Sequence, residues 1–283
     1  MRWRGRQQSR NVEDRRGMSR GRKVAMGGGV GTIIMALIAI FVLGQDPMQV
    51  LTQTMTQSQG TAPAESPAPR SAAEDEAAAF VSVVLRDTET IWAEIFRRAG
   101  QRYEPPTLVL FSGSTDTACG LGSAATGPFY CPADRKVYID LSFLSQLQRM
   151  GARGDFSVAY VIAHEVGHHV QTITGISRQV RAAQARASKT QQNALQVRME
   201  LQADCYAGVW ASLADAKYRT LEPGDIDEAM SAAAAVGDDT IQRSAGRAVR
   251  PETFTHGSSE ERMGWFQRGF RSGAVDQCDT FGG

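Results

Sequence analysis

The sequence is poor in the residues that build cysteine-rich metal sites. Among 283 residues there are four cysteines and four histidines, and no two cysteines form a Cys-x-x-Cys pair. This absence argues against a structural zinc site of that kind. No internal repeat is visible.

Large apolar residues are almost absent between Met55 and residue 73. The segment 44–73 is rich in Gln, Thr, Ser, Ala and Pro, a composition that cannot bury a core. We therefore expect residues 44–73 to be a flexible linker. About 210 residues remain after it, which is the size of one domain.

Charge of one sign is concentrated at the N-terminus. The whole chain carries +1, whereas the first 23 residues carry +7. The uncharged residues 24–43 follow directly and would span about 30 Å as a helix, the thickness of a bilayer core. This pattern predicts a basic cytoplasmic tail (1–23) and a transmembrane helix (24–43) in contact with the lipid bilayer. A cleaved signal peptide and a nucleic-acid arm are alternatives, but no nucleic-acid partner is expected.

A compact metal-binding motif occupies residues 164–168, which read His-Glu-Val-Gly-His. The preceding run 156–163 has no Pro or Gly and suits a buried helix. On a helix, His164 and His168 project from one face, and Glu165 lies about 100° further round. The two imidazoles can bind zinc while Glu165 acts as general base on its water. Two solvated histidines on a helix face are the alternative.

A second pair of side chains, Glu200 and Asp204, lies on a predicted helix from about Lys189 to Asp215. The two side chains share a face, so Glu200 can complete a site for one Zn²⁺ whose fourth position stays open. Asp204 can accept a hydrogen bond from a ligand imidazole and fix its tautomer. Two solvated acids are the alternative, although residues 203–210 are too apolar for a simple exposed face.

These motifs resemble the gluzincin peptidases, whose third ligand lies in a Glu-x-x-Ala-Asp segment. The chain is similar, over roughly residues 75–283, to the bacterial putative neutral zinc metallopeptidase family. The resemblance implies a mostly helical α+β zinc metallopeptidase domain with a small sheet, preceded by a membrane anchor. The likeness is carried by the phrases Gly127-Pro-Phe-Tyr-Cys-Pro132, Ala163-His-Glu-Val-Gly-His-His-Val-Gln171, Glu200-Leu-Gln-Ala-Asp-Cys205 and Thr255-His-Gly-Ser-Ser259.

The resemblance also gives His256 and Arg262 candidate roles. In related membrane-linked gluzincins, a Thr-His-Pro segment with an Arg six places after the His supplies an oxyanion-stabilising histidine. His256 and Arg262 match that spacing, but Gly257 stands where the proline would be. The alternative is a helix start, because Thr255 and the serines after Gly257 are good N-caps.

The four cysteines all follow the predicted anchor, in a compartment where disulfides form. They allow three connectivities. We expect Cys119–Cys131 to close a Gly-rich loop and Cys205–Cys278 to tie the C-terminus beside the second ligand helix. A free thiol at Cys205 is the alternative.

The expected elements are a small sheet followed by many helices, which is an α+β domain over residues 74–283. By analogy with gluzincins, strand 136–140 or its partner would be the edge along which an extended substrate binds. The predicted strands and helices are 74–98 (helix), 107–111 (strand), 129–131 and 136–140 (hairpin), 142–150 (helix), the helix of the His motif, 189–215 (helix), 223–236 (helix) and a last helix after residue 256.

The combined interpretation is a membrane-anchored, extracytoplasmic zinc endopeptidase of the bacterial cytoplasmic membrane, with its N-terminus inside. Its partner would be a peptide or protein substrate. A zinc-containing domain that binds a partner without cutting it, and a tethered module without metal, are the two alternatives. The sequence does not predict an oligomeric state.

Overall fold

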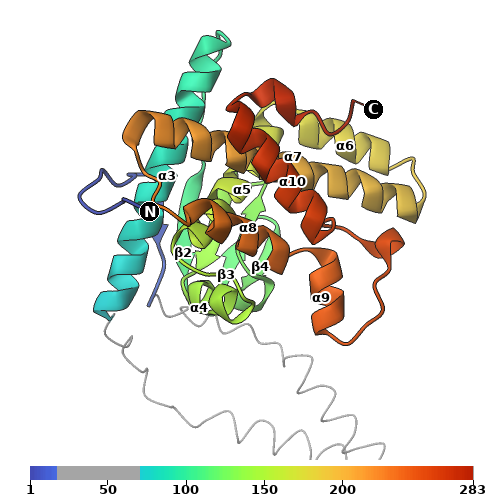
Figure 1. Ribbon diagram of the computed structural model, residues 1–283, viewed down its shortest axis with the longest axis horizontal. Coiled ribbons are helices and arrows are strands. Elements are labelled where there is room, and N and C mark those ends of the chain that lie inside the picture. The colour runs from blue at the N-terminus through green and yellow to red at the C-terminus, as the bar shows by residue number, and fades with distance from the viewer. Residues whose placement is uncertain (18–70, 283) are drawn as a thin grey trace, which may run out of the picture. The chain divides into compact units, whose positions relative to one another are not determined.

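The described part of the chain places a small sheet at one end of a group of helices (Figure 1). The computed structural model describes residues 1–17 and 71–282. Residues 1–16 and the chain from residue 71 onward belong to the same compact unit. This unit contains every element discussed below.

The main sheet has four strands in the order β1-β2-β6-β5. β1, β2 and β6 run parallel, whereas β5 is antiparallel to β6 and forms the predicted hairpin with it. A separate antiparallel hairpin, β3–β4, lies in the Gly- and Ser-rich stretch that the sequence assigned to a loop. The strands are β1 (Val12–Asp14), β2 (Thr107–Phe111), β3 (Ser114–Thr117), β4 (Gly120–Ser123), β5 (Phe129–Cys131) and β6 (Lys136–Asp140).

Helices make up most of the described chain, as predicted. Three of them begin with a capping box, in which a serine and the Glu or Gln three residues later hydrogen-bond each other's backbone N–H groups. These serines are Ser71, Ser188 and Ser258. The helices are α3 (Ala72–Arg98), α4 (Ser142–Arg149), α5 (Phe156–Ile173), α6 (Ile176–Gln184), α7 (Lys189–Tyr218), α8 (Asp225–Ala235), α9 (Asp238–Ser244) and α10 (Ser259–Ser272), with short 3₁₀ turns η1 (Ala124–Thr126), η2 (Pro251–Thr253) and η3 (Val275–Cys278).

α5 is the centre of the hydrophobic core. It is buried along nearly its whole length and packs against α3, α7 and α8. Phe156, at its start, stacks on Trp210 of α7 with ring centroids 6.0 Å apart. Gly175, with φ +85°, follows its end and starts the turn into α6. The apolar faces of α5 and α7 therefore fix the position of the histidine motif.

The N-terminal residues are part of this unit and form an edge strand of its sheet. β1 pairs in register with β2, matching Glu13 to Val109. Both guanidinium nitrogens of Arg6 lie 2.6 Å from the carboxylate of Asp87 in α3. Residues 1–16 of the expected tail 1–23 thus belong to the compact unit, whereas residues 18–23 lie outside the described residues.

Arg16 links the two ends of the segment that lies outside the described residues. Its Nη1 donates a hydrogen bond of 2.8 Å to the backbone oxygen of Glu74, and its Nη2 lies 3.2 Å from the carboxylate of Asp75. These contacts join residues 1–16 to the first turn of α3 within one compact unit.

The fold prediction needs one correction. The mostly helical α+β architecture with small sheets is as expected, but no helix within residues 1–17 and 71–282 is long and apolar enough to cross a membrane. The expected span 24–43 and linker residues 44–70 lie outside the described residues. The remaining predicted linker residues reach into α3, which begins at Ala72.

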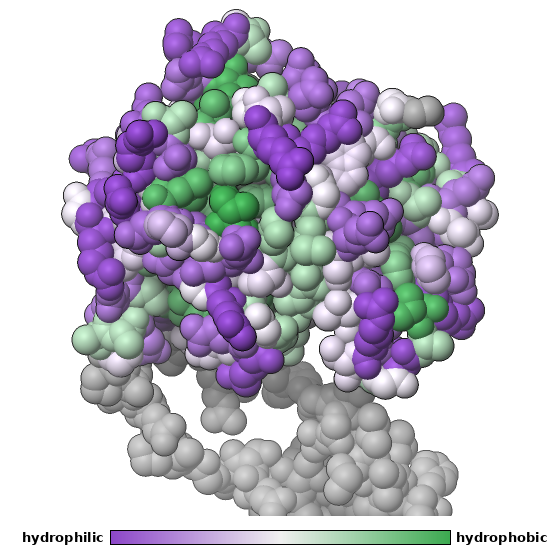
Figure 2. Space-filling model, viewed as in Figure 1, coloured by the Kyte–Doolittle hydropathy of each residue, from purple (hydrophilic) through white to green (hydrophobic). Residues whose placement is uncertain are grey.

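The surface carries mainly polar side chains. Figure 2 shows one face on which hydrophobic patches are small and separated by hydrophilic residues. The large apolar residues that are clearly exposed in the described chain are Leu121, Met150, Tyr218 and Ile241, of which Met150 and Ile241 line the cavity described below.

Candidate metal centre

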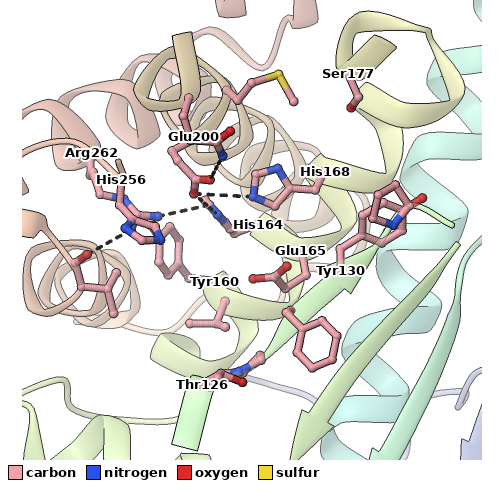
Figure 3. A pocket seen from close by; sticks show the side chains of 18 of the residues that line it. Thr126, Tyr130, Tyr160, His164, Glu165, His168, Ser177, Glu200, His256 and Arg262 are labelled. Atoms are coloured by element: carbon pink, nitrogen blue, oxygen red, sulfur yellow. Dashed lines mark hydrogen bonds and ion pairs between the residues drawn. The ribbon is translucent and has the colours of Figure 1, made fainter. Parts of the chain in front are cut away.

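The three predicted metal ligands come together where α5 and α7 touch (Figure 3). The Nε2 atom of His164 lies 3.2 Å from Oε2 of Glu200, and Nε2 of His168 lies 3.5 Å from the same oxygen. One donor atom from each residue lies within 4.8 Å of the other two. The spacing of His164, His168 and Glu200 in the sequence therefore corresponds to one cluster in space.

The donor set fits a zinc ion. Catalytic zinc sites commonly use two imidazole nitrogens and one carboxylate oxygen. Donors bound tetrahedrally at about 2.0–2.1 Å from zinc are separated by about 3.3 Å. The separations from Glu200 Oε2, 3.2 and 3.5 Å, bracket that value.

Gly167 allows the two ligand helices to approach each other. A Cβ atom at Gly167 would lie 3.1 Å from both the Cα and the backbone oxygen of Ala203 in α7. These contacts are tighter than ordinary van der Waals distance, so a larger residue would push the helices apart. The glycine inside the motif thus brings Glu200 within reach of both histidines.

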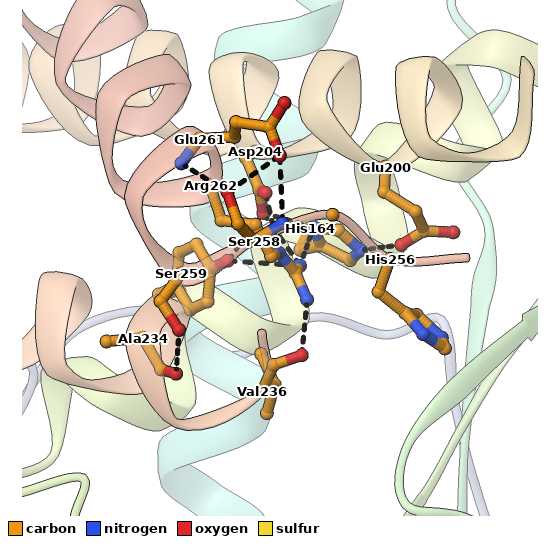
Figure 4. Close-up of polar contacts among 12 residues, drawn as sticks. His164, Glu200, Asp204, Ala234, Val236, His256, Ser258, Ser259, Glu261 and Arg262 are labelled. Atoms are coloured by element: carbon orange, nitrogen blue, oxygen red, sulfur yellow. Dashed lines mark hydrogen bonds and ion pairs between the residues drawn. The ribbon is translucent and has the colours of Figure 1, made fainter. Parts of the chain in front are cut away.

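His164 is oriented by a buried group of polar side chains (Figure 4). Its Nδ1 donates a hydrogen bond of 2.7 Å to Asp204, which leaves Nε2 free to face Glu200. Arg262 donates to both carboxylate oxygens of Asp204 at 2.8 and 2.9 Å, and the hydroxyl of Tyr160 also donates to Asp204. Asp204 and Arg262 therefore both lie on the Nδ1 side of His164, away from Glu200.

The charges of this group depend on one another. Burial opposes the charge on Asp204, but Arg262 and His164 outweigh it and hold the pKa of Asp204 below its usual value. Burial likewise works against a charged His164, yet Asp204 and Glu200 raise the pKa of its imidazole to about 10. In the metal-free protein the imidazole of His164 is thus protonated near neutral pH, and a metal ion must displace that proton.

Glu165 faces the same cavity from α5 (Figure 3). Burial raises the pKa of its carboxyl group above the usual value. The cavity has a volume of about 830 Å³ and is lined by all three ligand side chains as well as by Glu165 and residues 125–130 of the β4–β5 region. A carboxylate beside a metal position, in a cavity large enough for a peptide segment, is suited to proton transfer.

His256 lines the cavity opposite Glu165, just ahead of α10. Its side chain is 52% exposed, and its Nδ1 lies 3.3 Å from Oδ1 of Asp238. Asp238 also accepts the backbone N–H groups of Thr255, His256 and Gly257 at 2.6, 2.6 and 3.1 Å. The hydrogen bond to Asp238 is the main reason that the pKa of His256 is raised.

Gly257 explains why the chain departs from the expected proline. It adopts φ +89°, which a proline ring, fixed near −65°, cannot reach. Its N–H also donates to Asp238, a bond that proline could not form. The helix-start alternative holds as well, because Ser258 caps α10. The loop can therefore do both: it starts α10 and presents His256 to the cavity.

Comparison with known proteins connects this geometry to a family. The model of the family described as "Putative neutral zinc metallopeptidase" matches residues 1–281. The chain belongs to this family. An "uncharacterized protein YpfJ" of Escherichia coli strain K12 is 49% identical over 293 residues, covering 100% of this chain and 99% of the relative. An "uncharacterized protein Mb2605" of Mycobacterium bovis is 45% identical over 191 residues, which is 63% of each chain. No solved structure matches the chain.

The extent of this match agrees with the fold. The resemblance seen in the sequence covered residues 75–283, whereas the zinc metallopeptidase family model begins at residue 1. Residues 1–16 therefore belong to the family's region as well as to the compact unit.

Both expected disulfides are present in this member of the family. Cys119 is bonded to Cys131, and Cys205 to Cys278. The alternative of a free thiol at Cys205 is therefore wrong.

Sequence reasoning missed one side chain of the site, Gln171. Its Oε1 lies 2.9 Å from Nδ1 of His168, so it does for His168 what Asp204 does for His164. A glutamine three residues after the histidine, on the same helix face, was the available signal. His169, in contrast, is fully buried, and its Nε2 donates a hydrogen bond of 2.6 Å to the backbone oxygen of Glu104, which is a structural role.

Proposed function

We propose that this protein is a zinc-dependent endopeptidase that hydrolyses peptide bonds of extracytoplasmic proteins or peptides. One observation carries the proposal: Glu165 shares the cavity with His164, His168 and Glu200 but is not one of the three clustered donors. A site that only binds zinc has no use for that carboxylate. A zinc ion held by the three ligands would supply a Lewis acid for the scissile carbonyl and for the attacking water.

Glu165 would move the proton in this reaction. As a carboxylate it accepts a proton from the attacking water, and as the acid it returns the proton to the leaving amine. Burial of the carboxyl group, which raises its pKa, favours a group that can do both near neutral pH.

His256 would stabilise the negative charge that develops on the carbonyl oxygen. Nδ1 of its ring donates to Asp238, so Nε2 also carries a hydrogen only when the ring is protonated, a state that Asp238 favours by raising the pKa of His256. A donor directed at the developing oxyanion strengthens its interaction in the transition state. Because His256 lies on the loop ahead of α10, it approaches from the opposite side to Glu165.

The substrate would bind as an extended chain along β5. This strand is one edge of the sheet, with β6 on its other side, and Phe129 and Tyr130 line the cavity. The unpaired edge of a strand can accept backbone hydrogen bonds from a peptide, while the cavity selects its side chains. Of the two strands that the sequence offered for this role, the edge position favours β5.

An oxidising compartment suits this domain, because its two disulfides persist there and are rare in reducing cytoplasm. We therefore propose an extracytoplasmic location for the domain together with residues 1–16.

The Glu165→Gln variant of the full chain tests the proposal. We expect it to bind one zinc ion with unchanged affinity and to cleave peptides about 10²–10⁴-fold more slowly. Zinc content and the cleavage of a peptide library measure the two effects, and Glu260→Gln on the exposed start of α10 is the matched control.

Cleavage by Glu165→Gln at the wild-type rate would refute the role of Glu165. A cellular phenotype that survives loss of cleavage would favour the alternative of a non-catalytic binding domain.

A further inference from the structure

A chain of buried amide groups leads away from the second histidine ligand. Nδ1 of His168 donates to Oε1 of Gln171, as described above. The Nε2 group of Gln171 then donates to the backbone oxygen of Met199 at 2.7 Å and to Oε1 of Gln202 at 3.1 Å. Gln171 has no exposed surface, and Gln202 is 4% exposed. Both hydrogens of the Gln171 amide are thus used within the protein.

The series of buried amide groups ends at the C-terminal disulfide. Nε2 of Gln202 donates to the backbone oxygen of Cys278 at 3.0 Å. Cys278 lies in η3 and is bonded to Cys205 of α7. The disulfide therefore holds the last acceptor of the chain against the helix that carries Glu200 and Asp204.

The backbone oxygens of Met199 and Cys278 set the donor and acceptor at every hydrogen bond in this series of amide groups. A carbonyl oxygen can only accept, so each glutamine must turn its NH₂ group toward a carbonyl. The amide oxygen of Gln171 is thereby directed at His168, which must carry its proton on Nδ1. The Nε2 lone pair of His168 is left facing Glu200, the position a metal ligand requires.

We propose that Gln171 and Gln202 are positioning residues for the metal site, and that the Cys205–Cys278 disulfide sets how firmly the site holds its ion. The inference rests on the proposed zinc site but requires no particular substrate. Loss of Gln171 removes the partner of His168 directly. Loss of Gln202, or of the disulfide, keeps the hydrogen bond from Gln171 to Met199 and weakens only the one from Gln171 to Gln202.

The test compares metal affinity across a series of full-length variants. Partners that orient a ligand histidine typically change metal affinity 10–100-fold. We expect Gln171→Met to weaken zinc binding by about that factor, and Gln202→Met and the Cys205→Ala/Cys278→Ala pair by about 3–10-fold, at the lower end of the range. Competition with a chromophoric chelator gives the affinities, and the visible spectrum of the Co²⁺-substituted protein reports the ligand geometry.

Two controls separate positioning from general loss of stability. Gln192→Met removes a hydrogen bond from Gln192 of α7 to the backbone oxygen of Ala187, outside the amide chain. Cys119→Ala/Cys131→Ala removes the other disulfide. Both should keep zinc affinity within about twofold of wild type and leave the Co²⁺ spectrum unchanged.

The outcomes distinguish the two proposals. If wild type binds no zinc, the proposed function fails. If wild type binds one ion but Gln171→Met and Gln202→Met bind it equally well with an unchanged Co²⁺ spectrum, the positioning role alone is wrong, even if their thermal stability falls.

Discussion

Gly208 of α7 and Gly269 of α10 face each other at the point where the two helix backbones touch. A Cβ atom on Gly208 would lie 2.1 Å from the backbone oxygen of Phe266, and one on Gly269 would lie 2.0 Å from that of Cys205. Gly208 lies one helical turn after Asp204. The close contact there brings α10 near enough to α7 for Arg262 to bind Asp204.

Replacing Gly269 with alanine should therefore destabilise the protein by at least about 1–3 kcal/mol, because the added methyl group overlaps backbone atoms. Urea unfolding of the metal-free protein measures the change. Gly264→Ala is the matched control in the same helix: nothing lies within 4 Å of its Cβ position, so it should stabilise the helix by about 0.5–1 kcal/mol. Equal effects at both positions would contradict the role of the close contact.

Arg262→Met should cost about 3–5 kcal/mol, because it removes the guanidinium group that binds both oxygens of the buried Asp204 carboxylate. The double variant Asp204→Asn/Arg262→Met should recover part of that loss, since it removes both charges. A double-mutant cycle of unfolding free energies measures the coupling. Additive losses would show that the ion pair does not support the site.

Asp238→Asn should shift the alkaline limb of kcat/KM to lower pH. Asp238 raises the pKa of His256, while Glu200 adds to this effect and Arg262 opposes it, so the charged imidazole persists above its usual range. Without the Asp238 charge, His256 loses its proton at lower pH. The NMR titration of His256 checks the shift directly.

Asp239→Asn is the control for this pH shift. Asp239 also lies in the first turn of α9 but binds Ser259 and Arg243. A profile that moves equally in both variants would mean that the α9 turn, and not the pairing with His256, is responsible.

Arg6→Met should destabilise the protein more at pH 8 than at pH 5. Burial raises the pKa of Asp87 to about 6 even though Arg6 opposes the shift. The pKa of Asp87 is thus higher in the folded protein than its ordinary value of 3.8, which we take for the unfolded chain. The stabilisation that comes from protonating Asp87 is complete below pH 3.8 and is lost as pH rises through about 6. Removing Arg6 raises the pKa of Asp87 further, so protonation relieves the unpaired carboxyl group at pH 5 but not at pH 8.

Thermal unfolding at the two pH values measures the effect, with an expected loss of about 3 kcal/mol at pH 8. Arg4→Met is the control. Arg4 and its partner Glu76 are 75% and 54% exposed, so their ion pair contributes little. An Arg6→Met loss that does not change with pH would contradict the link to Asp87.

Local periodicity was enough to predict which side chains, His164, His168 and Glu200, come together in one cluster. The i, i+4 spacing of His164 and His168 fixes their geometry once they lie on a helix. The same reasoning placed Glu200 and Asp204 on one face of α7. Each of these predictions depends on one helix and on the apolar residues that bury it, which are visible within a short window of sequence.

The N-terminus could not be predicted in this way. Residues 1–16 appear basic and solvated because some of their acidic partners lie far along the chain: Asp87, for example, is 81 positions from Arg6. The same holds for β1, whose pairing with β2 spans about 95 residues. Gln171 was missed for a different reason, since an uncharged amide on a buried helix gives no charge pattern to notice.

The contact between Arg16 and Glu74 has a practical consequence for producing the protein. A fragment that begins at residue 71 would lack the outer strand and would leave the edge of β2 open to association with other chains. Because the two ends meet, excising residues 18–70 and joining the flanks with a few glycines and serines should yield an intact domain.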